Sequence, residues 1–232
     1  MKQKKNEKQK DIDFLETPLK RGIDKVYQMI LANGLFILFN LHILMVFIFI
    51  EPPNVIFFYI IFGLLSFNIL PSYVALTKVM KLPASEEQKV VKEYFIAYKE
   101  SFKGSFLLGI LVIFIGVNVL TLRMFFIAQS MMGLSQAMQG LFVVVIVVSV
   151  GLVYGGGAFN LSFWEITRIG FKNLVYLLPG AAAAMLISVI GLMAGGAFRM
   201  MLIIGFSLGA MAQIKLSKKA VSRIKQEKSE GA

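Results

Sequence analysis

Long apolar runs alternate with short polar segments along the chain, and this alternation predicts a helical membrane protein. A bilayer core about 30 Å thick requires about 20 apolar residues in a helix, and several runs of that length contain no Asp, Glu, Lys or Arg. We expect six transmembrane helices, at residues 29–50, 55–76, 104–122, 134–158, 174–194 and 197–214. Because six is an even number, both termini are expected on the same side of the membrane.

The overall composition supports this interpretation. Hydrophobic residues make up 57% of the 232-residue chain, and the mean hydropathy is +0.75. The core of a soluble protein of this length does not bury so much apolar surface. The predicted fold class is therefore all-α, a polytopic membrane protein.

Basic residues lie in alternate gaps between the apolar runs. Eight precede the first predicted span, six lie between the second and third, two between the fourth and fifth, and six follow the last. Arg123 and Arg199 lie toward the other side. Cytoplasmic loops carry the excess of Lys and Arg in membrane proteins. We therefore expect both termini in the cytoplasm, and we interpret the net charge of +11 mostly as an insertion signal.

The predicted spans divide the chain into three parts. Residues 1–28 form a basic cytoplasmic segment with a surface helix, residues 29–214 a six-span transmembrane domain, and residues 215–232 a basic cytoplasmic tail. No apolar stretch precedes residue 29, so we expect no cleaved signal peptide. The basic N-terminal arm has no interleaved aromatic residues that stack on bases, so we expect no nucleic-acid partner.

Three short segments suggest an internal repeat. Residues 31–34 (LANG), 102–105 (FKGS) and 171–174 (FKNL) recur at intervals of 71 and 69 residues. Each opens an odd-numbered span and follows a polar segment that we predict to be helical. We therefore expect three pseudo-repeated hairpins, each preceded by an amphipathic cytoplasmic helix.

Capping signals mark the starts of these cytoplasmic helices. Ser85 with Gln88, and Ser162 with Glu165, have the spacing of capping boxes, and Thr17 precedes a proline in the weaker first helix. We expect the second helix to lie in the membrane interface or against the bundle. Its apolar residues recur at three- and four-residue steps on one face: Val91, Phe95, Tyr98 and Phe102.

Two passages around the second and third spans carry a family resemblance. Residues 68–82 (NILPSYVALTKVMKL) and 93–111 (EYFIAYKESFKGSFLLGIL) resemble the YesL-like family of bacterial integral membrane proteins. The likeness extends from about residue 25 to 215. It implies a multi-span protein of the bacterial inner (cytoplasmic) membrane, in a family without established activity that is often encoded near carbohydrate-uptake and polysaccharide-degradation genes. The family's aromatic and basic pattern before the third span is filled here by Tyr94, Phe95, Tyr98, Lys99, Phe102 and Lys103.

Ionisable groups offer little chemistry inside the predicted membrane domain. No Asp or Glu lies in any predicted span, and ion-coupled carriers usually depend on a buried carboxylate. The chain has no cysteine and one histidine, which excludes disulfides and Cys-ligated zinc, and a lone imidazole does not build a catalytic triad. We therefore expect no catalytic, cofactor or metal site and no enzyme activity.

Neutral polar side chains inside the spans are the candidate ligand contacts. Such groups often form hydrogen bonds between membrane helices. If they instead face one cavity, they would bind a polar solute such as a sugar, and both interpretations remain open. The candidates are Asn40 and His42 in the first span, Asn68 in the second and Asn118 in the third.

Small residues in the second half of the chain predict close helix packing. Glycines four residues apart, such as Gly151 with Gly155 and Gly205 with Gly209, allow two helix backbones to approach closely, and Ala181 to Ala184 add a smooth patch. The run Gly155–Gly157 weakens the helix and predicts its end or a hinge there.

The favoured function is that of a non-enzymatic accessory or regulatory membrane protein associated with carbohydrate uptake. It would dock sugar-transport permease components through its cytoplasmic helices, recognised as helix in groove. The alternative is a small-solute-binding transport subunit or permease with a polar cavity between spans, and a third possibility is a structural membrane organiser without a ligand. The candidate docking residues are Tyr94, Phe95, Tyr98, Phe102 and Trp164.

Overall fold

The computed structural model describes residues 18–49, 54–157, 159, 161–193 and 201–230, and over these residues its regular structure is entirely helical. The first half contains α2 (Pro18–Phe39), α3 (Leu41–Phe49), α4 (Val55–Leu65), the 3-10 helix η1 (Ser66–Asn68), α5 (Ile69–Met80) and the 3-10 helix η2 (Ala84–Lys89). The second half contains α6 (Val90–Ala128), α7 (Met132–Gly157), α8 (Phe163–Lys172), α9 (Leu174–Met193), the π-helix η3 (Met201–Gly205), α11 (Phe206–Leu216) and α12 (Lys218–Glu230).

Several of these helices are long and apolar enough to cross a bilayer, so the chain is a helical membrane protein. Among the described residues, four helical segments meet this test: α2, Val55–Met80, α6 and α7. The bent pair α8 and α9 gives a fifth candidate, and Ile203–Leu216 is a shorter apolar helix. The expected six spans in three hairpins are therefore not established by helix length and composition alone.

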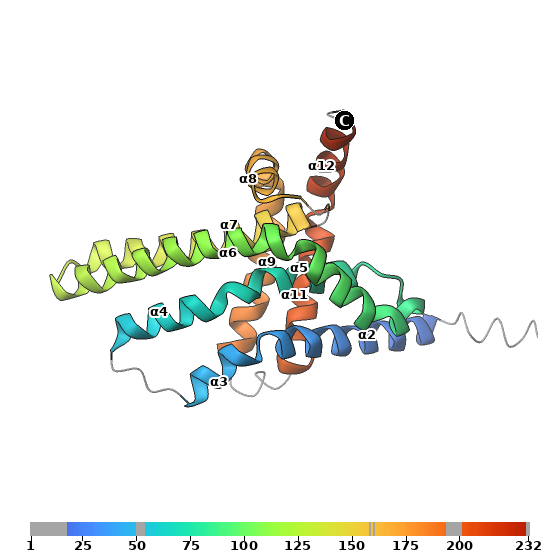
Figure 1. The fold of residues 1–232 in the computed structure, drawn as a ribbon, viewed down its shortest axis with the longest axis horizontal. Helices are drawn as coiled ribbons and strands as arrows, with labels where there is room; N and C mark the ends of the chain where they lie inside the picture. The colour runs from blue at the N-terminus through green and yellow to red at the C-terminus, as the bar shows by residue number, and fades with distance from the viewer. Residues whose placement is uncertain (1–17, 50–53, 158, 160, 194–200, 231–232) are drawn as a thin grey trace, which may run out of the picture.

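The helices run in two main directions (Figure 1). Helices α2, α4, α6 and α7 extend along the long axis of the molecule, and α6 and α7 form a hairpin that projects from the bundle. Helices α9 and α11 run across them near the middle of the molecule. The last two predicted spans therefore do not continue the direction of the first four.

Two of the three predicted surface helices are not separate elements, which corrects the sequence analysis. Helix α2 runs unbroken from Pro18 to Phe39, and α6 runs unbroken from Val90 to Ala128. The 39 residues of α6 span about 58 Å at 1.5 Å per residue, which exceeds the bilayer core by nearly a factor of two. The cytoplasmic part of the predicted repeat is therefore an extension of the same helix.

The start and the buried face of α6 also differ from the expectation. Residues 84–89 form a 3-10 helix, and the N-cap residue of α6 is Lys89, whose side chain makes no capping hydrogen bond, so the Ser85 box does not begin α6. The face turned to the bundle is offset by one position from the predicted face. Small residues allow the close approach on this face, which contains Val90, Tyr94, Ala97, Ser101, Gly104 and Ser105.

Only the third surface helix is distinct from its span. Helix α8 lies at 99° to the following helix, and the break is at Asn173. The predicted capping box is confirmed, because Glu165 Oε2 accepts a hydrogen bond of 2.9 Å from the Ser162 backbone N–H. Helix α8 therefore starts and ends where local side chains satisfy its backbone.

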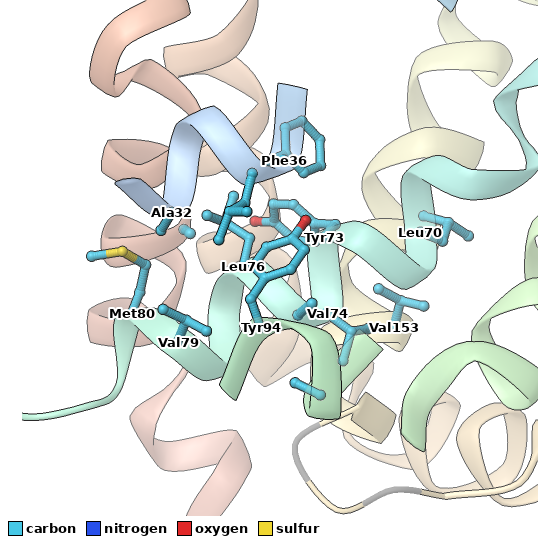
Figure 2. Close-up of a cluster of buried hydrophobic side chains, with 14 of the residues drawn as sticks. Ala32, Phe36, Leu70, Tyr73, Val74, Leu76, Val79, Met80, Tyr94 and Val153 are labelled. Atoms are coloured by element: carbon cyan, nitrogen blue, oxygen red, sulfur yellow. The ribbon is translucent and has the colours of Figure 1, made fainter. Parts of the chain in front are cut away.

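The hydrophobic core is centred on α5, whose side chains are more completely buried by neighbouring helices than those of any other described helix (Figure 2). Val74, Ala75, Leu76 and Val79 are fully buried between α2, α6 and α7. Large apolar side chains on α4, α6 and α7, such as Phe114, are exposed instead. Such outward apolar surface is expected where lipid rather than water surrounds the protein.

Glycines on α7 and α11 allow close helix contacts, as the sequence predicted. A Cβ on Gly151 would meet the Ala181 Cβ at 3.6 Å, and a Cβ on Gly209 would meet the Ala184 carbonyl oxygen at 3.1 Å. A Cβ on Gly156 would lie only 2.2 Å from Ile166 Cγ1. The run Gly155–Gly157 thus ends α7 and seats α8 against it.

The expected basic tail is a helix with a buried face. Helix α12 packs Ala220 and Ile224, both fully buried, against the ends of α7 and α9. These two positions are four residues apart and therefore lie on one side of the helix. The surrounding charged residues, such as Lys219 and Arg223, had hidden this short apolar pattern in the sequence.

Candidate functional site

Two helix breaks lie side by side in the first half of the molecule. One is at Asn40, between α2 and α3, and the other is the 3-10 turn Ser66–Asn68, between α4 and α5. Asn68 Nδ2 donates a hydrogen bond to the Phe39 carbonyl, and His42 Nε2 lies 2.9 Å from the Leu65 carbonyl oxygen. Each break therefore exposes a backbone carbonyl that a side chain from the other break reaches.

Local side chains help to interrupt these helices. Asn40 Nδ2 donates to the Phe36 carbonyl at 2.8 Å, and Ser66 Oγ donates to the Phe62 carbonyl at 2.6 Å. Side chains that bond to the preceding turn compete with the regular backbone ladder and often bend a membrane helix. The backbone at Asn40 accordingly forms i to i+3 hydrogen bonds on both sides.

A chain of hydrogen bonds connects the two breaks to α5 and α6. Asn40 Nδ2 also donates to Ser72 Oγ at 2.8 Å, and that hydroxyl donates to the Asn68 carbonyl. The Tyr98 hydroxyl donates to Asn68 Oδ1. We call Asn40, His42, Asn68, Ser72 and Tyr98 the helix-break junction, since they connect four helical segments around these breaks.

An aromatic layer covers the helix-break junction. The Phe39 ring lies 5.2 Å from the Tyr94 ring, 5.3 Å from Phe95 and 4.6 Å from Tyr98, measured between centroids. The Tyr94 hydroxyl also donates to the Ser72 carbonyl at 3.1 Å. The rings keep water from the hydrogen bonds beneath them, which strengthens those bonds.

The structure brings together three of the four predicted polar candidates. Asn40 and Asn68 are buried, with 7% and 5% of their surface exposed, and His42 is half-buried. Asn118 lies elsewhere on α6, where it is exposed and donates only to the Phe114 carbonyl of its own helix, at 2.7 Å. Spacing along the sequence did not reveal that Asn118 faces away from the bundle.

Sequence reasoning did not identify Ser72 as a member of this site. It also missed a second set of buried polar groups that joins α2, α5, α7 and α11. Gln213 accepts from the Tyr73 hydroxyl and donates to the Val150 carbonyl, and Gln28 donates to the Val79 carbonyl at 2.8 Å. Isolated glutamines at the ends of apolar runs were the available signal for these contacts.

The helix-break junction contains no carboxylate, and no group of three metal-ligating side chains occurs within the described residues. Its amides and hydroxyls donate mostly to protein carbonyls and to each other. One polar atom departs from this pattern: Asn40 Oδ1 is buried and accepts no hydrogen bond from the described part of the chain. The arrangement therefore suits the positioning of helices, with one acceptor left for a small donor.

The predicted docking residues divide between the core and the surface. Tyr94 is fully buried, so its ring is not available to a partner, and Tyr98 and Phe102 are half-buried with ring centroids 5.4 Å apart. Phe95 is 51% exposed, and Trp164 at the start of α8 is 77% exposed. Only Phe95 and Trp164 thus present most of their ring to the surroundings.

Comparison with known proteins gives one match. Residues 53–124 match the model of a family described as a protein of unknown function, DUF624. YesL-like proteins belong to this family, so the resemblance found in the sequence is confirmed. The matched segment contains α4, α5 and nearly all of α6, and with them Asn68, Ser72 and Tyr98. No curated protein and no solved structure matches the chain.

Proposed function

We propose that this chain, a match to the DUF624 family of unknown function, is a non-enzymatic accessory or regulatory membrane protein associated with carbohydrate uptake. The observation that supports this proposal is that the candidate polar side chains form hydrogen bonds between helices. Asn40 and Asn68 pair across helices with Ser72 and Tyr98. Side chains committed to holding helices together are not free to carry a solute through the protein.

Exposed aromatic rings provide the surface for a partner. Phe95 lies on the part of α6 that precedes the predicted third span, and Trp164 lies on α8, which precedes the predicted fifth span. Aromatic residues are enriched where proteins bind each other. The expected partner is a sugar-transport permease component, because the YesL-like resemblance implies a setting of carbohydrate uptake. Recognition would insert these rings into grooves of the partner.

A crosslinking and uptake experiment tests this proposal. The variant Phe95→Ser with Trp164→Ser is expected to lose the crosslink to a sugar permease in native membranes and to lower sugar uptake. Phe125→Ser is the matched control, because Phe125 is equally exposed on α6 but lies near the opposite end of that helix. Unchanged crosslinking and uptake in the double variant, at normal membrane levels, would contradict the proposal.

A second candidate function has one specific observation in its favour. The unpartnered Asn40 Oδ1 lies between two broken helices, and broken helices line the solute sites of many transporters. A small-solute-binding subunit or permease would place a solute hydroxyl on this oxygen. In that case Asn40→Asp, which keeps the acceptor oxygen but replaces the amide donor by a second acceptor, alters solute binding measured by calorimetry, whereas the Asn118→Asp control does not.

We also propose that the chain spans the bacterial cytoplasmic membrane six times with both termini in the cytoplasm. The distribution of Lys and Arg supports this orientation. The four long helical segments, the bent pair and the shorter Ile203–Leu216 helix supply six apolar segments. If the transverse hairpin of α9 and α11 does not cross, four crossings remain. Four is also an even number, so both termini still lie on one side.

Because the chain has no native cysteine, single cysteines report the topology directly. Met131→Cys, between α6 and α7, should react with a membrane-impermeant maleimide from outside. Ser229→Cys, in α12, should react only after the membrane is permeabilised. Gly196→Cys, in the outer turn predicted between the last two spans, should react from outside. Reaction of Gly196→Cys only after permeabilisation would reduce the number of crossings to four.

A further inference from the structure

Two cations converge on one aromatic ring at the start of α9. Lys219 Nζ lies 5.2 Å from the centroid of the Tyr176 ring, and Arg223 Cζ lies 4.1 Å from it. The two cations are four residues apart on α12 and therefore share one face of that helix. An aromatic ring attracts a cation, but two cations near one ring also repel each other.

Acidic side chains do little to offset this charge. Glu227, in the next turn of α12, forms an ion pair of 3.0 Å with Lys172 at the end of α8. Within the described part of the chain, no carboxylate lies within ion-pair distance of Lys219 or Arg223. We call Lys172, Tyr176, Lys219 and Arg223 the cationic corner, because they meet where α8, α9 and α12 join (Figure 1).

The cationic corner is held in place by the fold. Helix α12 is anchored by the buried side chains of Ala220 and Ile224. The 99° bend between α8 and α9 places Lys172 and Tyr176 on either side of Asn173. The charges are thus presented on packed helices, so little conformational entropy is lost when they bind an anion.

Exposed apolar residues are the sequence neighbours of Lys172 and Tyr176. Phe171 precedes Lys172 and is 56% exposed, and Val175 precedes Tyr176 and is 77% exposed. Trp164, on the same short helix as Phe171, is also exposed. Cationic and apolar groups that alternate in this way match an amphiphile, with a charged headgroup and a hydrocarbon part. A free inorganic anion would leave the apolar half unoccupied.

From this geometry we propose that the cationic corner binds the headgroup of an anionic phospholipid of the cytoplasmic leaflet. The phosphodiester oxygens accept hydrogen bonds from Arg223 and Lys219, and the adjoining acyl chain lies along Phe171 and Val175. The negative headgroup relieves the repulsion between the two cations, and the anionic leaflet supplies it at high local concentration. The lipid would hold α12 and α8 together at the membrane surface.

The test uses the full-length protein, delipidated in a neutral detergent. Phosphatidylglycerol is added, and lipid retention is measured by native mass spectrometry together with the thermal unfolding midpoint. Wild type should retain phosphatidylglycerol and unfold at a higher temperature, whereas phosphatidylcholine should do neither. The variant Lys219→Gln with Arg223→Gln should bind phosphatidylglycerol at least about tenfold more weakly.

The matched control removes the same charge from the same helix. Lys218→Gln with Lys225→Gln changes two exposed lysines away from the Tyr176 ring contacts, and this variant should bind nearly as wild type does. Equal loss in both double variants would overturn the proposal, because net charge alone would then explain binding. Equal stabilisation by inorganic phosphate or by phosphatidylcholine would overturn it as well.

A milder variant keeps the test valid if the double variant does not fold. Arg223→Lys retains the charge but loses the planar fork that donates two parallel hydrogen bonds to a phosphate group. It should fold and bind phosphatidylglycerol several-fold more weakly than wild type. Unchanged retention in this variant would contradict direct headgroup recognition.

Discussion

The helix-break junction and the cationic corner both concentrate polar groups in an apolar protein, but they use them differently. In the junction, Asn68 donates to Phe39 and accepts from Tyr98, so its hydrogen-bonding groups are used inside the protein. In the corner, Lys219 and Arg223 contact a ring, and both residues are exposed. The junction therefore serves the stability of the fold, and the corner is available to a ligand.

This difference follows from what surrounds each set of groups. A polar group enclosed by apolar side chains costs free energy unless it is paired, so the junction requires partners on several helices. Cations at a membrane surface remain hydrated or meet lipid headgroups and need no protein partner. Substitutions in the junction should lower stability, whereas substitutions in the corner should change lipid binding with little change in stability.

The largest expected effect comes from the contact that seats α8, on which the cationic corner depends. Gly156→Ala places a Cβ 2.2 Å from Ile166 Cγ1, and we expect a loss of about 3 kcal/mol in the free energy of unfolding. Gly140→Ala in the same helix is the control, because nothing lies within 4 Å of its added Cβ. The control should be stabilised by up to about 1 kcal/mol, since alanine favours a helix. Denaturant titration in detergent micelles measures both values.

Asn68→Ala tests the claim that the helix-break junction is structural. It leaves the Phe39 carbonyl and the Tyr98 hydroxyl without this partner, so we expect a loss of about 2 kcal/mol in unfolding free energy. Asn118→Ala is the matched control, because Asn118 is exposed and bonds only within its own helix. Its effect should stay within about 0.5 kcal/mol. Equal losses in the two variants would remove the distinction between paired and exposed polar groups.

Much of the architecture was predictable because hydrophobicity and residue size are local properties of the sequence. Apolar runs predicted membrane helices, the Ser162 box predicted the start of α8, and Gly151 and Gly209 predicted close packing. The sequence also singled out Asn40 and Asn68 as polar groups in apolar surroundings. These features require no knowledge of which helix lies beside which.

The remaining features depend on tertiary arrangement. The pairing of Asn68 with Tyr98 depends on how α4, α5 and α6 are rotated against each other, and the burial of Tyr94 depends on the same rotation. The FKGS segment was wrongly taken as a helix boundary. Gly104 there serves close packing instead, since an added Cβ would lie 2.6 Å from the Leu161 carbonyl oxygen. The sequence around a glycine does not reveal whether that glycine breaks its helix or allows a neighbouring segment to approach closely.

A smaller effect is expected from removal of a single hydroxyl in the helix-break junction. Tyr98→Phe keeps the ring packed on Phe39 and loses only the hydrogen bond to Asn68, so the cost should be about 1 kcal/mol. Combined with Asn68→Ala, it should add almost nothing, because the first substitution already removes the shared bond. Full additivity in this double-mutant cycle would show that the two side chains do not interact.

The smallest effect on stability is expected in the cationic corner. Glu227→Gln removes the ion pair with Lys172, whose side chain is 67% exposed, so the unfolding free energy should change by less than about 0.5 kcal/mol. The same substitution frees Lys172 and makes the corner more positive, so phosphatidylglycerol retention should rise about threefold. Lys172→Gln removes the same ion pair but also a cation, and retention should fall instead. If both variants lose more than about 1 kcal/mol of stability, the ion pair is structural, and the corner resembles the junction after all.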